Sequence, residues 1–416
     1  MISSLISRST GFKSKSENMT VKTLSRYRVV WGGVTLTCWL SLFLLVLHHS
    51  EVPVILGRYS LTYFTLLICA LIGVVLVTIT NQERLSRLIR CLPGMVTFGV
   101  FMIVGCSALE AFVRIVDLGG VSYYQEVRRY SLERMTDPRL IIKHQPLKQY
   151  VLQGVEVQIN DLGLRNNSVQ TKAESERRIL AIGDSITFGW GTAQELTFSA
   201  RLERNLTERL KRPIRVINAG VGGYNTLQEA TYLENEGLAL NPDLVMLTYV
   251  TNDTEVVVGP FDPKSELSMT GKPPLTVMKL LAWESWTYRL VSHLWRSAKT
   301  QRTIDAYEAL KKSEGWKVSM DSLRRIVTLC ETRQVPLVVY FYDLQSSPYN
   351  EALIRDVREA VRPFPVEDTA PWFVSYPIRS LVVSKVDSHP NAKGHEILAD
   401  GMASHLLKVL TQADPT

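Results

Sequence analysis

Long apolar stretches dominate the N-terminal part of the chain. Three of them, Val29–Leu47, Leu61–Thr80 and Gly94–Val113, each run for about 20 residues with at most one charged side chain, which is the length that crosses a bilayer core as a helix. The pattern predicts three transmembrane helices within residues 29–116. Glu110 and Arg114 lie four residues apart in the third span, and we expect them to pair at its outer end, with a function for Glu110 inside the membrane as the alternative.

Beyond residue 157 the pattern changes to short apolar runs that alternate with stretches of helical periodicity. Buried strands are predicted over Ile179–Ile182, Ile214–Ile217, Leu244–Val250 and Pro336–Tyr342, with one or two more within Phe373–Val383. Helices are predicted over Glu195–Arg212, Leu227–Leu240, Val318–Arg333, Glu351–Val361 and Ala392–Leu410. The alternation favours an α/β domain with a mostly parallel sheet covered by helices on both faces, a flavodoxin-like three-layer arrangement.

These patterns divide the chain into four parts. We predict a basic tail over residues 1–28, a three-helix membrane region over 29–116, a connector over 117–156 and the α/β domain over 157–416. A stretch rich in Pro and Trp at about 255–312 interrupts the α/β rhythm as an insertion. It fits a substrate wall or lid, an amphipathic segment resting on the membrane, or an ordinary helical decoration of the domain.

The distribution of charge sets the expected topology. The whole net charge of +7 lies within residues 1–92, before the first span and between the second and third, so the remainder of the chain is neutral and does not favour nucleic-acid binding. Basic segments stay on the cytoplasmic side, which predicts a cytoplasmic N-terminus and an extracytoplasmic domain on a bacterial inner (plasma) membrane. Cys330 is the single cysteine of the soluble domain, and neither a disulfide nor a metal site is expected.

Side chains able to carry out acyl transfer follow the ends of the predicted strands. Ser185 stands in the turn Gly183-Asp-Ser just after the first strand, Gly223 lies in a Gly-rich turn after the second, and Asn252 follows the third. His389 and Asp387 lie near the C-terminus in Asp-Ser-His-Pro. Each residue also has a purely structural interpretation as a turn or cap residue, and it is their joint order that favours a catalytic set.

This order of motifs resembles the SGNH (GDSL) hydrolase superfamily, in its membrane-anchored type, over roughly residues 157–410. The resemblance implies that Ser185 is the nucleophile, that its own amide, Gly223 and Asn252 form the oxyanion hole, and that His389 is the general base. The family usually places its acid three residues before the histidine. Position 386 is Val here, so the acid is assigned to Asp387, two residues before.

The segment Asn160-Asp-Leu-Gly-Leu-Arg165 precedes the nucleophile strand and is similar to a stretch found in many membrane-tethered relatives. Arg165 is expected to make structural pairs, with contact to an anionic substrate group as the alternative.

Two enzymatic functions and one non-enzymatic function fit these observations. The first is a membrane-anchored serine esterase that removes O-acyl groups, acetyl in the first instance, from an extracytoplasmic glycan or other ester through a Ser185 acyl-enzyme. The second is an O-acyltransferase that acetylates an envelope or secreted polysaccharide, and the third is a non-catalytic glycan-binding scaffold. The expected partners are the lipid bilayer, an ester or glycan substrate, and a multi-span membrane acyltransferase or polysaccharide-export machinery; no cofactor or metal is expected.

Overall fold

The computed structural model describes residues 93–255, 285–297 and 303–413 of the 416-residue chain. Within these, residues 93–118 and 285–289 form one compact unit, and the remainder form a second. The first two predicted spans lie outside the described residues, as does most of the predicted insertion.

A five-stranded parallel sheet forms the centre of the second unit. Its order is β6-β5-β7-β8-β9, with every neighbouring pair parallel. The bounds are β5 Arg177–Gly183, β6 Ile214–Asn218, β7 Leu244–Tyr249, β8 Leu337–Phe341 and β9 Val366–Asp368. Every side chain of β7 and β8 is buried, as expected for strands that are covered on both faces. The predicted α/β class with a parallel sheet is confirmed.

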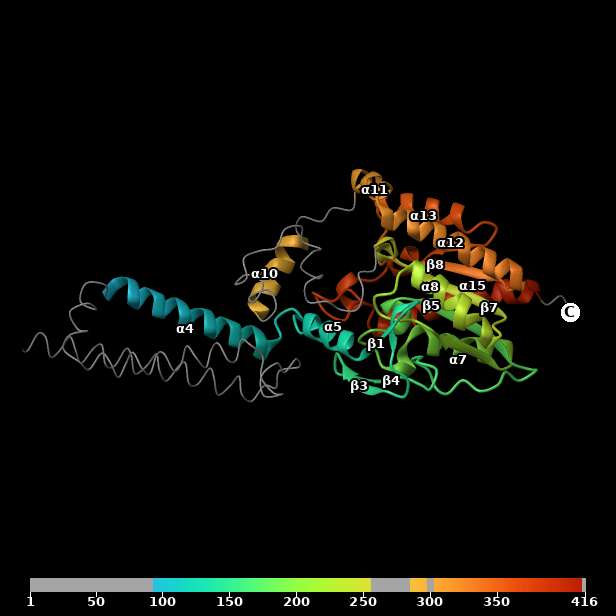
Figure 1. Ribbon diagram of the computed structural model, residues 1–416, viewed down its shortest axis with the longest axis horizontal. Helices are drawn as coiled ribbons and strands as arrows, with labels where there is room; N and C mark the ends of the chain where they lie inside the picture. The colour runs from blue at the N-terminus through green and yellow to red at the C-terminus, as the bar shows by residue number, and fades with distance from the viewer. Residues whose placement is uncertain (1–92, 256–284, 298–302, 414–416) are drawn as a thin grey trace, which may run out of the picture. The chain divides into compact units, whose positions relative to one another are not determined.

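Helices cover the two faces of this sheet (Figure 1). One face packs against α7 (Phe198–Leu210) and α15 (Ala392–Ala413), whose apolar stripes bury residues such as Leu202 and Met402. The other face packs against α8 (Thr226–Tyr232), α12 (Glu314–Arg333) and α13 (Pro348–Ala360). A short helix, α11 (Ile304–Leu310), packs against α13.

Capping residues fix where the helices begin. Thr197 caps α7 through its hydroxyl, and Ser313 and Ser347 do the same for α12 and α13. Asn225 and Gln228 form a reciprocal capping box at the start of α8. The helix predicted to run on to Leu240 leaves regular α-geometry after Tyr232 and continues in wider and tighter turns over 233–240.

The prediction of strands within Phe373–Val383 is wrong. That stretch holds the end of α14 (Ala370–Phe373), a 3₁₀ turn at Ile378–Ser380 and a single β-bridge between Val382 and Pro390. The fifth strand is β9, which lies earlier in the chain. Its three residues, Val-Glu-Asp, are half-buried and mostly acidic, so it lacks the apolar run by which the other strands are predicted.

The segment predicted as a connector is structured. Helix α5 (Tyr123–Leu132) leads into two β-hairpins, one of β1 (Arg134–Asp137) with β2 (Ile141–His144), the other of β3 (Gln149–Leu152) with β4 (Val155–Gln158). In β4 apolar and polar residues alternate, as is typical of a strand with one exposed face. These elements belong to the same compact unit as the sheet, and their aromatic side chains pack against residues that follow the nucleophile turn.

In the first unit, α4 (Pro93–Val116) is long and apolar enough over Gly99–Val116 to cross a membrane. Glu110 and Arg114 form the predicted ion pair, with Nε 2.8 Å from the carboxylate. The same carboxylate accepts the Ser285 hydroxyl and the amides of Trp286 and Thr287, the first residues of α10 (Trp286–Ser297). Glu110 thus also satisfies free amides at a helix N-terminus.

Candidate active site

The turn after β5 presents Ser185 at the carboxyl end of the sheet. Ser185 is the first residue of the short helix α6 (Ser185–Phe188), and Asp184 caps this helix by accepting the Ile186 amide at 2.8 Å. Gly183 is required for close packing, because a Cβ at this position would lie 2.2 Å from the Thr187 hydroxyl oxygen. The turn therefore places the Ser185 hydroxyl in a fixed position just beyond the strand.

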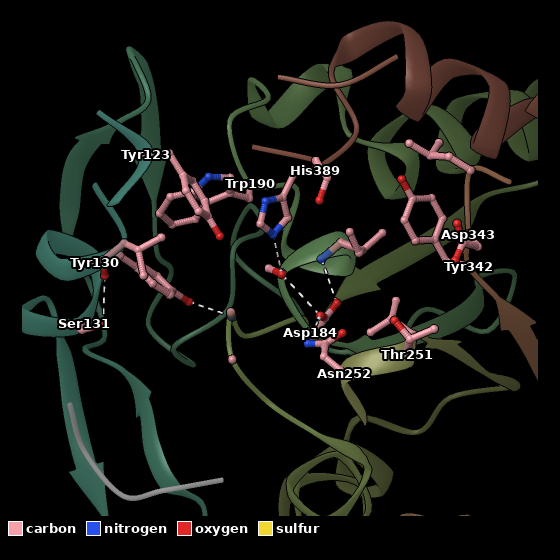
Figure 2. A pocket seen from close by; sticks show the side chains of 18 of the residues that line it. Tyr123, Tyr130, Ser131, Asp184, Trp190, Thr251, Asn252, Tyr342, Asp343 and His389 are labelled. Carbon is pink, nitrogen blue, oxygen red and sulfur yellow. Dashed lines mark hydrogen bonds between the residues drawn. The ribbon is translucent and has the colours of Figure 1, made fainter. Parts of the chain in front are cut away.

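His389 reaches this hydroxyl from the loop before α15. Its Nε2 lies 2.8 Å from Ser185 Oγ (Figure 2), and its Nδ1, on the other side of the ring, lies 2.5 Å from Asp387 Oδ1 in the same loop. The His389 amide also donates to Asp387 Oδ1 at 3.1 Å, which closes a tight turn over two residues. This turn explains how a carboxylate only two positions before the histidine can reach its ring.

Asp387 is fully buried and held by groups outside this loop. Trp190 Nε1 donates to Asp387 Oδ2 at 2.9 Å, and Gln153 Nε2 lies 3.5 Å from the same oxygen. The Asp387 amide donates to Ser384 Oγ. One carboxylate oxygen thus faces the imidazole, while the other is satisfied by an indole N–H, which fixes the orientation of the acid.

The predicted oxyanion donors lie in the same pocket as Ser185. Gly223 has a φ of 82°, a left-handed conformation that favours glycine, and its neighbour Gly222 also lines the pocket. The Asn252 side-chain nitrogen donates to Asp184 Oδ2 at 3.2 Å. An amide NH₂ carries two N–H donors, so this bond orients Asn252 and leaves its second donor for a ligand.

Arg165 is buried beneath the nucleophile turn. Its guanidinium donates to the carbonyls of Phe188, Gly189 and Thr192 at 2.6 to 3.0 Å and lies over the Phe188 ring. Burial lowers the pKa of Arg165 to about 10, so the group remains charged at neutral pH. Of the two roles expected for Arg165, the structure favours the structural one.

Three neighbouring buried carboxyl groups, those of Asp184, Asp253 and Glu229, have raised pKa values. Burial raises the pKa of Asp184 above its ordinary value. Burial also raises the pKa of Asp253 and of Glu229 well above the ordinary values, and repulsion from neighbouring carboxylates adds to the effect. Asp253 Oδ2 accepts the Val250 amide, and the Glu229 carboxyl has no hydrogen-bond partner in the described part of the chain. Each of these shifts is in the direction that disfavours the charged form of the carboxyl group.

The pocket has a volume of about 430 Å³ and opens between two walls. Figure 2 shows Tyr123, Tyr130 and Trp190 on one side and Tyr342, Asp343 and Thr251 on the other. The rings of Tyr123 and Trp190 lie 5.9 and 5.8 Å from the His389 ring, centroid to centroid. Aromatic surface therefore borders the candidate base.

Sequence reasoning missed the contribution of α5 to this wall. Tyr123, Val127 and Tyr130 line the pocket from one face of α5, and Arg134 follows from β1. Their spacing of four and three residues is an amphipathic signal that was available in the sequence. It predicts a buried helix face but does not indicate which pocket that face lines.

The arrangement can support nucleophilic catalysis. A serine hydroxyl is a weak nucleophile until a neighbouring imidazole accepts its proton, and the imidazole here is oriented by a carboxylate on its other nitrogen. Among the described residues, no cluster of His, Cys, Asp and Glu is arranged to hold a metal ion.

Comparison with known proteins gives one family match. The model of the GDSL-like lipase/acylhydrolase family matches residues 181–397, which is more than half of the chain. Its range includes Ser185, Gly223, Asn252, Asp387 and His389. No curated protein matches.

Several solved structures are similar to the chain at low identity. A two-domain esterase active on acetylated mannans, co-crystallised with mannopentaose, is 17% identical with a TM-score of 0.37, over 58% of this chain and 51% of that one. An acetylxylan esterase from Geobacillus stearothermophilus is 17% identical with a TM-score of 0.34, over 54% and 92%. A lipolytic protein of the G-D-S-L family from Desulfitobacterium hafniense is 14% identical with a TM-score of 0.34, over 55% and 98%. The chain thus spans about half the length of the two-domain esterase.

Proposed function

Because the chain belongs to the GDSL-like lipase/acylhydrolase family and is a serine ester hydrolase, we propose that it removes short O-acyl groups, acetyl in the first instance, from an extracytoplasmic glycan. The observation that carries the catalytic part is the contact of Ser185 Oγ with His389 Nε2 at 2.8 Å, continued by Asp387 on Nδ1. The substrate and the membrane anchor are further parts of the proposal.

In the proposed acylation step, Ser185 Oγ attacks the ester carbonyl carbon while its proton passes to His389 Nε2. The carbonyl π electrons move onto oxygen, and the resulting oxyanion accepts hydrogen bonds from the amides of Ser185 and Gly223 and from the Asn252 side chain. Asp387 stabilises the imidazolium that forms. The intermediate then collapses, the C–O bond to the alcohol breaks, and the alcohol leaves with the proton from His389.

Deacylation repeats these events with water. His389 takes a proton from a water molecule as its oxygen attacks the acyl carbon, the same donors stabilise the second oxyanion, and Ser185 leaves with the proton. The products are a carboxylic acid and the regenerated enzyme.

The lining of the pocket supports a short acyl group on a polar alcohol. The pocket is lined by apolar side chains such as Val127 and Leu344 and by polar ones such as Ser131, Thr251 and Asp343. A long alkyl chain would have to desolvate these polar groups without bonding to them, which is costly. A sugar carries hydroxyls that can bond to them, and the rings of Tyr123 and Trp190 offer flat surface for its apolar face.

The location is proposed from the sequence together with α4. One helix in the described residues meets the requirements for crossing a membrane, and the basic excess of residues 1–92 predicts that the domain lies outside. The partners proposed are therefore the bilayer and a glycan made or exported at the membrane, with acyltransferase or export machinery beside it.

An experiment that varies the length of the acyl chain and then offers acetylated glycans tests this proposal. Full-length protein in detergent is given p-nitrophenyl acetate, butyrate and octanoate, and then acetylated xylan and mannan oligomers, with Ser185→Ala as the control. We expect the acetate ester to have the highest kcat/KM and acetate to be released from an acetylated oligomer, with no turnover by Ser185→Ala. Preference for octanoate, or acetylation of added glycan faster than acetate release, would contradict the proposed substrate or the hydrolytic outcome.

A further inference from the structure

The turn that carries Gly223 is held from outside by two side chains that acyl transfer does not itself require. The Gly222 amide donates to the Tyr130 hydroxyl oxygen at 2.8 Å, and the Gly222 carbonyl accepts from Arg134 Nη1 at 2.5 Å. A Cβ at Gly222 would lie 2.7 Å from the Tyr130 ring, so the ring packs directly on this glycine. Both peptide groups that flank Gly222 are therefore fixed by the segment before the sheet.

The donor and acceptor roles of the neighbouring groups fix the direction of the hydrogen bonds that the Tyr130 hydroxyl makes to His144 and Gly222. The Gly163 carbonyl can only accept, so His144 Nδ1 donates to it at 3.1 Å, and burial lowers the pKa of His144 to about 3, which leaves Nε2 without a proton. Nε2 therefore accepts the Tyr130 hydroxyl at 2.7 Å. The Tyr130 oxygen remains as the acceptor for the Gly222 amide. A continuous series of hydrogen bonds thus runs from the Gly163 carbonyl, in the Asn160–Arg165 motif, through His144 and Tyr130 to Gly222.

Arg134 carries its charge into the pocket. Its Nη2 donates to Ser131 Oγ at 3.0 Å, and its guanidinium carbon lies 4.6 Å from the centre of the Tyr130 ring. Over the residues that the structure describes, this guanidinium has no carboxylate partner. The Gly222 carbonyl thus accepts a bond from a cation whose charge is not neutralised by an ion pair.

The contact of Arg134 with the Gly222 carbonyl also affects the Gly223 N–H. The Gly222 carbonyl and the Gly223 amide are the two ends of one planar peptide group, so a side chain that fixes the oxygen also fixes the direction of the N–H. A cationic donor on the oxygen also polarises the peptide and makes its N–H a stronger donor. Oxyanion donors are effective because they are aimed before charge develops.

We infer that Tyr130 and Arg134 are positioning residues for the oxyanion hole: they hold the two peptide groups on either side of Gly222, Tyr130 through the Gly222 N–H and Arg134 through the Gly222 carbonyl, so that the Gly223 N–H faces the oxygen of the reacting ester. The inference rests on the proposed serine esterase function and adds two residues to it. Both lie outside residues 181–397, which match the family model.

The test uses Tyr130→Phe, Arg134→Lys, Arg134→Gln and Arg134→Ala in the full-length protein, with phenyl acetate as a neutral ester and 4-acetoxybenzoate as an anionic one. Tyr150→Phe is the matched control for Tyr130, because Tyr150 is buried in the same aromatic cluster and its hydroxyl has no hydrogen-bond partner in the described residues. Arg139→Gln is the control for Arg134, because Arg139 is exposed and donates to Asn235. Thermal unfolding is measured for every variant.

We expect Tyr130→Phe and Arg134→Gln to lower kcat about 10- to 100-fold on both esters with KM changed less than about threefold, because the lost interaction is made only in the transition state. Binding of a boronic acid that forms a tetrahedral adduct on Ser185 should weaken by a similar factor. Millimolar guanidinium, but not the same concentration of sodium, should restore part of the activity of Arg134→Ala, and Arg134→Lys should fall between wild type and Arg134→Gln.

Three results would overturn the inference. One is wild-type kcat in both Tyr130→Phe and Arg134→Gln. Another is a rise in KM confined to the anionic ester, which would make Arg134 a substrate-recognition residue. The third is a loss of activity that follows a loss of folded protein and is not rescued by guanidinium. Failure of the underlying esterase proposal looks different, because Ser185→Ala would then retain the activity of the wild type.

Discussion

The bond from Trp190 to Asp387 gives a sharp prediction about how the acid is held. Trp190→Phe keeps an aromatic ring beside Tyr123 and Tyr130, whose centroids lie 6.1 and 5.4 Å from that of Trp190, but removes the N–H that Asp387 Oδ2 accepts at 2.9 Å. The remaining contact of this oxygen, Gln153 Nε2 at 3.5 Å, is longer than an ordinary hydrogen bond.

The magnitude follows from the burial of the acid. Asp387 is 0% exposed, so water does not replace the lost donor. A hydrogen bond to a charged group contributes about 1.5–3 kcal/mol, and at about 1.4 kcal/mol for each factor of ten this predicts a fall in kcat/KM of about 10- to 150-fold. The upper end of this range, about 150-fold, applies if the whole free energy of the lost hydrogen bond is lost in the transition state, in which the His389 imidazolium forms.

The assay is hydrolysis of p-nitrophenyl acetate by wild type, Trp190→Phe and Trp372→Phe. Trp372 packs against Gly401 of α15 and does not line the pocket, so its variant controls for loss of an indole in the same domain. We expect Trp372→Phe to stay within about threefold of wild type, since a substitution away from the site acts mainly on stability. Near-wild-type kcat/KM in a folded Trp190→Phe would refute the idea that the indole orients the acid.

Three further predictions concern the oxyanion hole, the nucleophile turn and pH. Asn252→Ala should lower kcat about 10²- to 10³-fold with little change in KM, measured on the same ester, and an increase in KM alone would place Asn252 in ground-state binding. Arg165→Met removes the guanidinium donor from three buried carbonyls, of which that of Gly189 keeps the Thr192 amide, and should lower the free energy of unfolding by about 3 kcal/mol or more, measured by urea titration against the exposed control Arg324→Met; equal midpoints would contradict this role. Burial lowers the pKa of His395 to about 3 from an ordinary 6.5, so the unfolded chain binds more protons than the folded chain between these two pH values. The contribution of His395 to stability is therefore complete above pH 6.5 and is lost as the pH falls toward 3, at about 1.4 kcal/mol per pH unit. The difference in unfolding free energy between wild type and His395→Gln should follow that slope, and parallel pH curves would contradict it.

Much of the catalytic domain could be predicted because its strands are buried on both faces. Continuous apolar runs identify β5, β6, β7 and β8, and in a parallel sheet the carboxyl ends of neighbouring strands meet at one edge. That rule is enough to expect Ser185, Gly223 and Asn252 in one pocket. Strand β9 could not be predicted in this way, because an edge strand of three half-buried residues leaves no apolar pattern.

The interactions that hold these residues were less accessible to sequence reasoning. Trp190 lies five residues after Ser185, yet its partner Asp387 is 197 positions away, and no local pattern encodes such a contact. Tyr130 and Arg134 likewise contact Gly222 from 92 and 88 residues away. Contacts of this kind depend on how segments distant in the chain pack together, which periodicity does not determine.

The central claim is that an acyl group passes through the Ser185 oxygen. The most direct measurement is to mix full-length protein with an activated acetyl ester, quench in acid within a turnover, and locate the acetyl group by peptide mass spectrometry. We predict one acetyl group on Ser185, which appears before free acetate is released and disappears once the ester is exhausted. We predict no acetyl group on Ser185→Ala, which should also be inactive. Acetyl on another residue, or continued turnover by Ser185→Ala, would contradict the claim.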